Sequence, residues 1–173
     1  MALLIDHLMA LSRVARMDLL IESVDISAVA RSVCAEVLRA YPDRAIDILV
    51  SPGLTAAADA AVLRVVLTNL VDNACKYTSK HDEARIEIGA LQTGAEQAFF
   101  VRDNGAGLDL EQAPQLFGAF QRFHDAADFP GDGIGLATVR RLVTRHGGRV
   151  WAESAVGEGA TFCFTLGTPS ADA

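Results

Sequence analysis

Apolar and polar residues recur along much of this chain with helical spacing, most clearly between Asp59 and Thr78. The apolar stripe of that segment consists of Leu63, Leu67, Leu70 and Ala74. A second stripe, about a third of a turn away, consists of Asn69, Asn73 and Lys76, with Tyr77 beside them. We expect a helix, opened by Asp59, that buries one face and holds a polar site along its edge. An ordinary amphipathic helix with solvated side chains is the alternative, although asparagine is a mediocre residue for a helix interior.

Three further segments have helical spacing. Residues 2–20 repeat Leu4, Leu8, Leu11 and Ala15, and we interpret them as the end of a longer helix because no cap precedes them. A helix docked on its own domain is the alternative for this segment. A second helix is expected from Asp25 or Ser27 to Ala40, and a third over 133–146, ended by Gly147 and Gly148. Residues 111–123 should contain a short helix that ends in aromatic residues.

Shorter segments with period-two alternation or apolar runs predict strands between turn residues. They cover residues 21–26, 45–50, 54–58, 84–90, 97–102, 150–152 and 160–166. The fourth and fifth should form a hairpin, as should the last two. The order lacks regular strand–helix–strand alternation, so we predict an α+β fold, a two-layer sandwich with a mixed, mostly antiparallel sheet and helices on one face. We expect one domain over 23–167, preceded by a helical segment 1–22 and followed by a disordered tail 168–173.

Composition narrows the classes of partner. The 173 residues are 51% hydrophobic and 21% charged, which describes a globular chain with a substantial core. The net charge of −7 argues against nucleic acid or an anionic membrane as a partner. No apolar run is long enough to span a bilayer, and no secretory signal is visible. The cysteines, Cys34, Cys75 and Cys163, lack metal-like spacing, so we expect a reducing, cytoplasmic environment.

Glycine-rich segments follow the predicted strands and precede the last predicted helix. Asp103-Asn104-Gly105-Ala106-Gly107 places a carboxylate at a strand end, beside a backbone that a ligand could approach closely. The segment 131–136, GDGIGL, opens directly into a helix, whose N-terminal amides and dipole favour an anion. This segment lacks the lysine and hydroxyl residue of a Walker loop, and no strand immediately precedes it as in a Rossmann fold.

These motifs are more specific in combination than singly. The asparagine and lysine stripe, the D-x-G-x-G turn, Phe117-x-x-Phe120, the G-x-G-x-G segment and a G-x-G-x-T segment ending at Thr161 follow one another in that order. This order resembles the ATP-binding catalytic domain of sensor histidine kinases, of the GHKL or Bergerat-fold group that also includes gyrase, Hsp90 and MutL. The resemblance extends to kinases attached to phytochrome or PAS sensors. It implies that residues 1–22 are the remnant of a dimerisation and phosphoacceptor domain.

The resemblance implies a role for each motif. Asn73 would ligate Mg²⁺, Asn69 would lie near the metal and phosphates, Lys76 would reach a phosphate and Tyr77 would lie along the adenine. Asp103 would accept the adenine amino group, with Gly105 and Gly107 admitting the base. Phe117 and Phe120 would anchor a lid over 124–132. Arg122 would meet the γ-phosphate, Gly131, Gly133, Gly135 and Leu136 would line the triphosphate, and Thr161 would lie at the back of the pocket.

Asn69 helps to choose within this group. ATP-hydrolysing relatives carry a glutamate at the corresponding place, where it activates water, whereas an amide cannot accept that proton. The resemblance therefore implies a kinase in which Asn69, Lys76 and Arg122 act by positioning and charge stabilisation. An ATPase is disfavoured for the same reason.

The phosphoacceptor histidine is missing from its expected place. None of His7, His81, His124 and His146 has the expected setting, so the acceptor should belong to a dimerisation domain of the same or a sister chain. A response regulator would act downstream, and residues 2–20 could form a homodimer. Two alternatives stay open: a serine kinase of the anti-sigma-factor type and an interaction module without catalysis.

Overall fold

The computed structural model describes residues 18–111, 115–119 and 133–167. Of the helix predicted over 2–20, residues 1–17 lie outside these ranges, and residues 18–20 are not helical. The predicted lid, 124–132, and the tail, 168–173, also lie outside them. In the predicted short helix over 111–123, the described residues form turns, such as that closed by the Gly118 N–H and the Gln115 carbonyl at 2.7 Å. Within the described ranges, no helix is long and apolar enough to cross a lipid bilayer.

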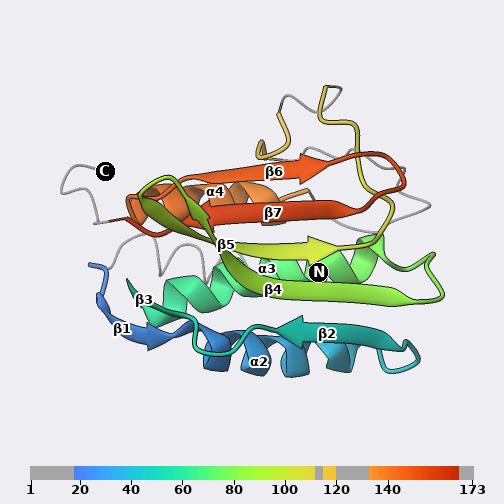
Figure 1. Ribbon diagram of the computed structural model, residues 1–173, viewed down its shortest axis with the longest axis horizontal. Helices are drawn as coiled ribbons and strands as arrows, with labels where there is room; N and C mark the ends of the chain where they lie inside the picture. Colours follow the sequence, from blue (N-terminus) through green and yellow to red (C-terminus); the bar gives the residue numbers. More distant parts are fainter. Residues whose placement is uncertain (1–17, 112–114, 120–132, 168–173) are drawn as a thin grey trace.

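One mixed sheet forms the body of the molecule, and a small two-stranded sheet lies beside it (Figure 1). The large sheet has the order β2-β4-β5-β7-β6, in which only β2 and β4 pair in parallel. Its strands are β2 (Ile46–Val50), β4 (Ala84–Thr93), β5 (Glu96–Asp103), β6 (Val150–Ser154) and β7 (Ala160–Thr165). The small sheet pairs β1 (Glu22–Asp25) with β3 (Thr55–Ala58). The predicted mixed, mostly antiparallel sheet and both predicted hairpins are confirmed.

Helices cover one face of this sheet, as the sequence predicted (Figure 1). They are α2 (Ile26–Val37), α3 (Ala60–Tyr77) and α4 (Gly135–Arg145), with a short 3-10 turn η1 (Leu38–Ala40) after α2. Asp25 caps α2 and Asp59 caps α3, because their carboxylates accept N–H groups of the first turn at 2.8 to 3.0 Å. Compared with the predicted bounds, α2 ends at Val37 instead of Ala40, and α4 begins at Gly135 instead of Gly133.

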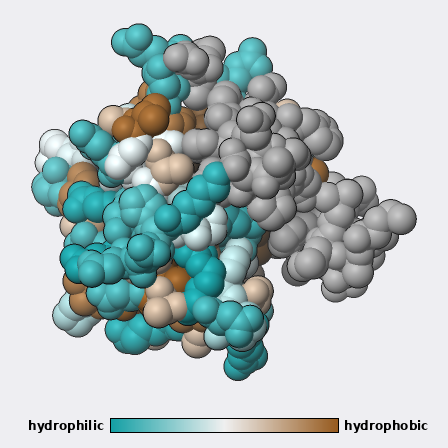
Figure 2. Space-filling view, turned by 90° about the vertical axis from the view of Figure 1, so that its right-hand side faces the viewer, coloured by the Kyte–Doolittle hydropathy of each residue, from teal (hydrophilic) through white to brown (hydrophobic). Residues whose placement is uncertain are grey.

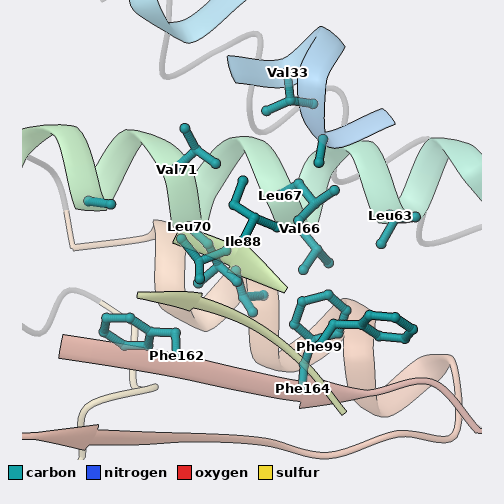
Figure 3. Close-up of a cluster of buried hydrophobic side chains, with 14 of the residues drawn as sticks. Val33, Leu63, Val66, Leu67, Leu70, Val71, Ile88, Phe99, Phe162 and Phe164 are labelled. Atoms are coloured by element: carbon teal, nitrogen blue, oxygen red, sulfur yellow. The ribbon is translucent and has the colours of Figure 1, made fainter. Parts of the chain in front are cut away.

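The core lies between α3 and the central strands (Figure 3). Leu67 and Leu70 point from α3 toward the sheet, where Phe99 of β5 and Phe164 of β7 meet with ring centroids 5.8 Å apart. These side chains are almost fully buried, so the apolar stripe of α3 fixes the rotation of the helix. With that stripe buried, the neighbouring polar stripe has to lie at the border of the core.

Candidate functional site

The polar stripe of α3 lies at that border, as the helical spacing predicted. Asn69, Asn73, Lys76 and Tyr77 are all half-buried, in contrast to the fully buried leucines of the adjacent stripe. Half-buried amides and amines keep part of their hydrogen-bonding capacity for a ligand while the helix holds them in place. The same helix therefore supplies both core packing and a row of donors and acceptors.

Asn69 joins this row to the start of α4. Its Nδ2 donates to the Val65 carbonyl at 2.8 Å, which directs Oδ1 away from that turn. A methyl group on Gly135 would lie only 2.9 Å from Asn69 Oδ1. Two motifs that are 66 residues apart in the sequence, at positions 69 and 135, are thus in direct contact.

The start of α4 has the features of an anion-binding helix terminus. Ile134 precedes the helix and has no polar side chain with which to cap its first N–H groups. Gly133 adopts a left-handed backbone conformation with φ of 72°. Leu136 is partly buried against the core, so its side chain anchors this end of α4. The N-terminus of α4, where the helix dipole favours negative charge, therefore lies next to Asn69.

Asn73 differs from Asn69 in its partners. Among the described residues, the Asn73 side chain makes no hydrogen bond to another side chain or to a carbonyl, although Asn73 is half-buried. The same residues contain no group of three or more histidines, cysteines, aspartates or glutamates that could hold a metal ion. An amide oxygen is a hard ligand that suits Mg²⁺, which takes its other ligands from water and phosphate. The residues present thus fit a magnesium ion held mainly by a nucleotide.

The loop after β5 is fastened to the C-terminal end of α3. The Ala106 N–H donates to the Tyr77 carbonyl at 3.0 Å, and a methyl group on Gly105 would lie 2.4 Å from the same oxygen. Gly107 has φ of 62°, and a methyl group there would lie 2.0 Å from the Ala155 carbonyl. Both positions therefore require glycine because of close contacts within the chain, independently of any ligand. The sequence did not reveal these contacts.

Asp103 lies at the end of β5, on the face of the sheet that the helices cover. Its side chain is only 5% exposed, and Oδ1 accepts the Gly105 N–H at 2.8 Å. Burial raises the pKa of Asp103 to about 6, and the backbone amides of Gly105 and Ala160 partly oppose that rise. At neutral pH the carboxylate is therefore ionised and buried, which suits it to accept a hydrogen bond from an amino group of a ligand.

Thr161 does not reach this site. Ala160 and Phe162 of β7 pack in the core, so strand alternation turns Thr161 to the opposite face of the sheet. There its Oγ1 accepts from Arg102 Nε at 3.2 Å. The prediction that Thr161 lies at the back of the pocket is not supported by this geometry. Ala160, which pairs with Asp103, occupies the place beside the carboxylate instead.

The remaining predicted residues divide into two groups. Phe117 packs partly into the core, with its ring edge-on to Phe162 at a centroid distance of 6.4 Å, so it anchors the segment after the loop. Phe120, Arg122 and Gly131 lie outside the described residues, and their roles stay predictions. Where Figure 2 colours the described residues at the end of the molecule to which β5 runs in Figure 1, most of them are hydrophilic.

The histidines were also judged from the sequence, and the structure describes two of them. His146 is fully buried: its Nε2 accepts the Asp59 N–H at 3.1 Å and its Nδ1 lies 3.3 Å from the Gly167 carbonyl. This histidine therefore joins the ends of α4 and β7 to the start of α3 and is structural. His81 is exposed in the turn after α3.

One functional candidate, Asp72, was not predicted from the sequence. Asp72 binds Lys76 through an ion pair of 2.6 Å, one helical turn apart. The spacing of four residues was a visible signal for this pair.

Comparison with known proteins supplies the family context. The family described as "Histidine kinase-, DNA gyrase B-, and HSP90-like ATPase" matches residues 58–170. The chain is 37% identical over 169 residues to the methanogenesis regulatory histidine kinase FilI of Methanothrix harundinacea, covering 95% of this chain and 19% of that protein. It is 33% identical over 166 residues to cyanobacterial phytochrome A of Nostoc sp., covering 96% of this chain and 22% of that protein.

A solved structure gives the same indication. Full-length ShkA in complex with AMPPNP superposes with a TM-score of 0.75 at 29% identity, covering 96% of this chain and 35% of that one. The chain spans about a fifth of the length of the two curated relatives. The similarity therefore concerns one part of each of these larger proteins.

Proposed function

Because this chain belongs to the family of histidine kinase-, DNA gyrase B- and HSP90-like ATPases, we propose that it is the Mg-ATP-binding catalytic domain of a two-component sensor histidine kinase. It would transfer the γ-phosphoryl group of ATP to a histidine on a dimerisation domain. The observation that carries this proposal is that two glycine-rich motifs both contact α3, the helix that carries the asparagine and lysine stripe. Asn69 contacts the start of α4, and the Tyr77 carbonyl holds the loop that follows Asp103.

Each part of this arrangement suits one part of the nucleotide. The buried carboxylate of Asp103 would accept the exocyclic amino group of adenine, and Tyr77 would lie along the base. The N–H groups at the start of α4 would bind phosphate oxygens, and Lys76 would contribute a positive charge. Asn73 would hold Mg²⁺, which when bound neutralises charge on the phosphates.

Asn69 supports a kinase rather than an ATPase. Its Nδ2 is committed to the Val65 carbonyl and its Oδ1 faces Gly135, and an amide has no basic group with which to deprotonate water. The described part of the site would therefore bind ATP without activating a water molecule. That property suits a domain whose γ-phosphoryl group has to wait for a histidine.

The acceptor would come from outside the residues described. His146 is fully buried between α3 and α4, so ATP cannot reach it without unfolding, and His81 lies in an exposed turn. We propose a phosphoacceptor domain of the same or a sister chain as the first partner, a response regulator as the second, and residues 2–20 as a dimer contact. The cysteines are free and buried, in keeping with a cytoplasmic, reducing setting.

A phosphotransfer assay tests this proposal. The chain is incubated with ATP labelled at the γ-phosphate, Mg²⁺ and a separately supplied phosphoacceptor histidine domain from a related kinase. We expect acid-labile label on the acceptor, and less of it when Asp103→Asn replaces the unchanged chain at the same ATP concentration. Acid-stable label on a serine would identify a serine kinase. Steady release of inorganic phosphate would identify an ATPase. Failure to bind a fluorescent ATP analogue would favour an interaction module.

A further inference from the structure

Lys76 does not extend freely from α3. Its Nζ lies 2.6 Å from Oδ2 of Asp72, one turn earlier on the helix, and the side chains are 27% and 34% exposed. A lysine side chain has four rotatable bonds and loses considerable entropy when it is fixed in one place. The ion pair restricts that freedom before any ligand is present, while two of the three ammonium N–H bonds can still point elsewhere.

The other oxygen of Asp72 is also occupied. Asp72 Oδ1 accepts the Tyr41 hydroxyl at 2.8 Å, so the carboxylate is held from two sides. Burial, with a smaller contribution from the charge of Asp72, raises the pKa of Tyr41 well above its ordinary value. The hydroxyl therefore keeps its proton at neutral pH and donates a hydrogen bond to Asp72.

Tyr41 is itself fixed against the end of α3. Arg44, three residues later, donates to the Cys75 carbonyl and to Thr78 Oγ1, the second at 3.2 Å. The Arg44 guanidinium also lies 5.8 Å from the centre of the Tyr41 ring. A cation at a helix C-terminus is favoured by the helix dipole, so this arrangement stabilises the last turn that carries Lys76. The segment 41–44 therefore forms a clamp on α3.

We propose that Asp72, held by Tyr41, is a positioning residue that places the Lys76 ammonium for contact with a phosphate of the bound nucleotide. The inference rests on the proposed function, because it assumes that a nucleotide occupies this site. Asp72 itself would not touch the nucleotide. Its effect would pass through Lys76, because the ion pair fixes the direction in which the Lys76 side chain extends from α3.

A different role for Asp72 makes the opposite prediction. If Asp72 only neutralised Lys76, its removal would leave a stronger positive charge beside the triphosphate, and Lys76 would contribute more to binding. If Asp72 positions Lys76, its removal would leave a mobile lysine that contributes less. A double-mutant cycle separates these roles, because it measures how the cost of losing Lys76 depends on Asp72.

The cycle compares the unchanged chain with Lys76→Met, Asp72→Asn and the double variant. Calorimetry measures the affinity of each for the magnesium complex of AMPPNP and for adenosine, which lacks phosphates. We expect Lys76→Met to weaken AMPPNP binding about tenfold in the unchanged background, as for one charge-assisted hydrogen bond, and less than about twofold in the Asp72→Asn background. Adenosine affinity should be the same in all four proteins.

Two further variants keep the test specific. Tyr41→Phe preserves the ring but removes the hydroxyl, and it should reduce the cost of Lys76→Met to about threefold. Glu87→Gln removes a carboxylate from the Arg102 ion pair on another part of the surface and should leave the cost at about tenfold. Circular dichroism establishes that each variant is folded.

The outcomes are distinct. An equal or larger cost of Lys76→Met in the Asp72→Asn background would overturn the positioning role, while AMPPNP binding by the unchanged chain would leave the proposed function standing. The same holds if Asp72→Asn weakens adenosine as much as AMPPNP, since the effect would then be structural. No AMPPNP binding by the unchanged chain would contradict the proposed function and this inference together.

Discussion

Asn69 Oδ1 lies against Gly135, so close that a methyl group at position 135 would be 2.9 Å from the oxygen. Gly135 is the first residue of α4, and Asn69 lies in the middle of α3. Because Asn69 Nδ2 is bonded to the Val65 carbonyl, the amide cannot simply rotate by half a turn without losing that bond. The contact therefore couples the orientation of Asn69 to the position of the α4 N-terminus.

Replacing Gly135 by alanine tests this coupling. The added methyl group meets the end of a side chain rather than backbone, and alanine favours a helix over glycine, so stability should change by less than about 1 kcal/mol. The Asn69 amide should move, and AMPPNP affinity should fall about tenfold, the equivalent of one hydrogen bond. Urea unfolding, the Asn69 side-chain NMR signals and calorimetry measure the three effects. Unchanged Asn69 signals with unchanged affinity would show that the contact has no influence on binding.

Two glycines in the turn before β7 separate backbone strain from close packing. Gly157 and Gly159 have nearly equal φ values, 81° and 82°, but only Gly159 is crowded, since a methyl group there would lie 2.0 Å from the Asp103 carbonyl. Gly157→Ala should cost about 1 kcal/mol for its left-handed conformation alone. Gly159→Ala should cost at least about 2 kcal/mol more, because the backbone that carries Asp103 has to shift. Equal costs in urea unfolding would contradict the close approach.

Asp103 should make stability depend on pH. Burial raises its pKa from the ordinary 3.8 to about 6, so between these values the unfolded chain releases the proton before the folded one does. The contribution of Asp103 to stability is therefore complete below pH 3.8 and is lost as the pH rises through about 6. The loss is about 3 kcal/mol at most, for a shift of about two units.

Asp103→Asn is the control for this pH dependence, because all other carboxyl groups titrate in both proteins. The free energy of unfolding, measured in urea from pH 4 to pH 7.5, should decline more steeply for the unchanged chain than for the variant. Comparing the slopes of unfolding free energy against pH removes any pH-independent difference in stability that the asparagine amide introduces. Parallel curves would mean that Asp103 titrates alike in both states and is not desolvated as the structure indicates.

Much of the fold follows from local patterns in the sequence. The helical spacing of α3 predicted both its buried face and its polar row, because one rotation of the helix fixes both. Alternation at Ile86 and Ile88, and at Phe162 and Phe164, identified strands whose inner faces pack under that helix. Asp25 and Asp59 marked helix starts through a preference that depends on the nearest few residues.

Thr161 shows where such patterns fail. Strand side chains alternate between faces, so an error of one position reverses the direction of a side chain completely. A motif that ends in Gly-Ala-Thr does not reveal which of the last two residues lies beside Asp103, and the pairing of Ala160 with Asp103 decides it.

Contacts between distant segments were equally hidden. Tyr41 and Asp72 are separated by 31 residues, and nothing in the local spacing of either indicates the other. Glycines raised a related difficulty at Gly105 and Gly107. The sequence indicates that these positions need space or an unusual conformation, but only the structure shows that the Tyr77 and Ala155 carbonyls occupy that space.

The most direct test of the account is a calorimetric titration of AMPPNP into the chain with and without Mg²⁺, repeated for Asp103→Asn and Asn73→Ala. We predict that the unchanged chain binds more tightly with Mg²⁺. Asp103→Asn should weaken binding by roughly 5- to 150-fold, equivalent to about 1–3 kcal/mol for one buried polar pair, and Asn73→Ala should abolish the effect of the metal. Undiminished affinity in Asp103→Asn, together with an unchanged response of Asn73→Ala to Mg²⁺, would contradict the claim that these residues form a Mg-ATP site.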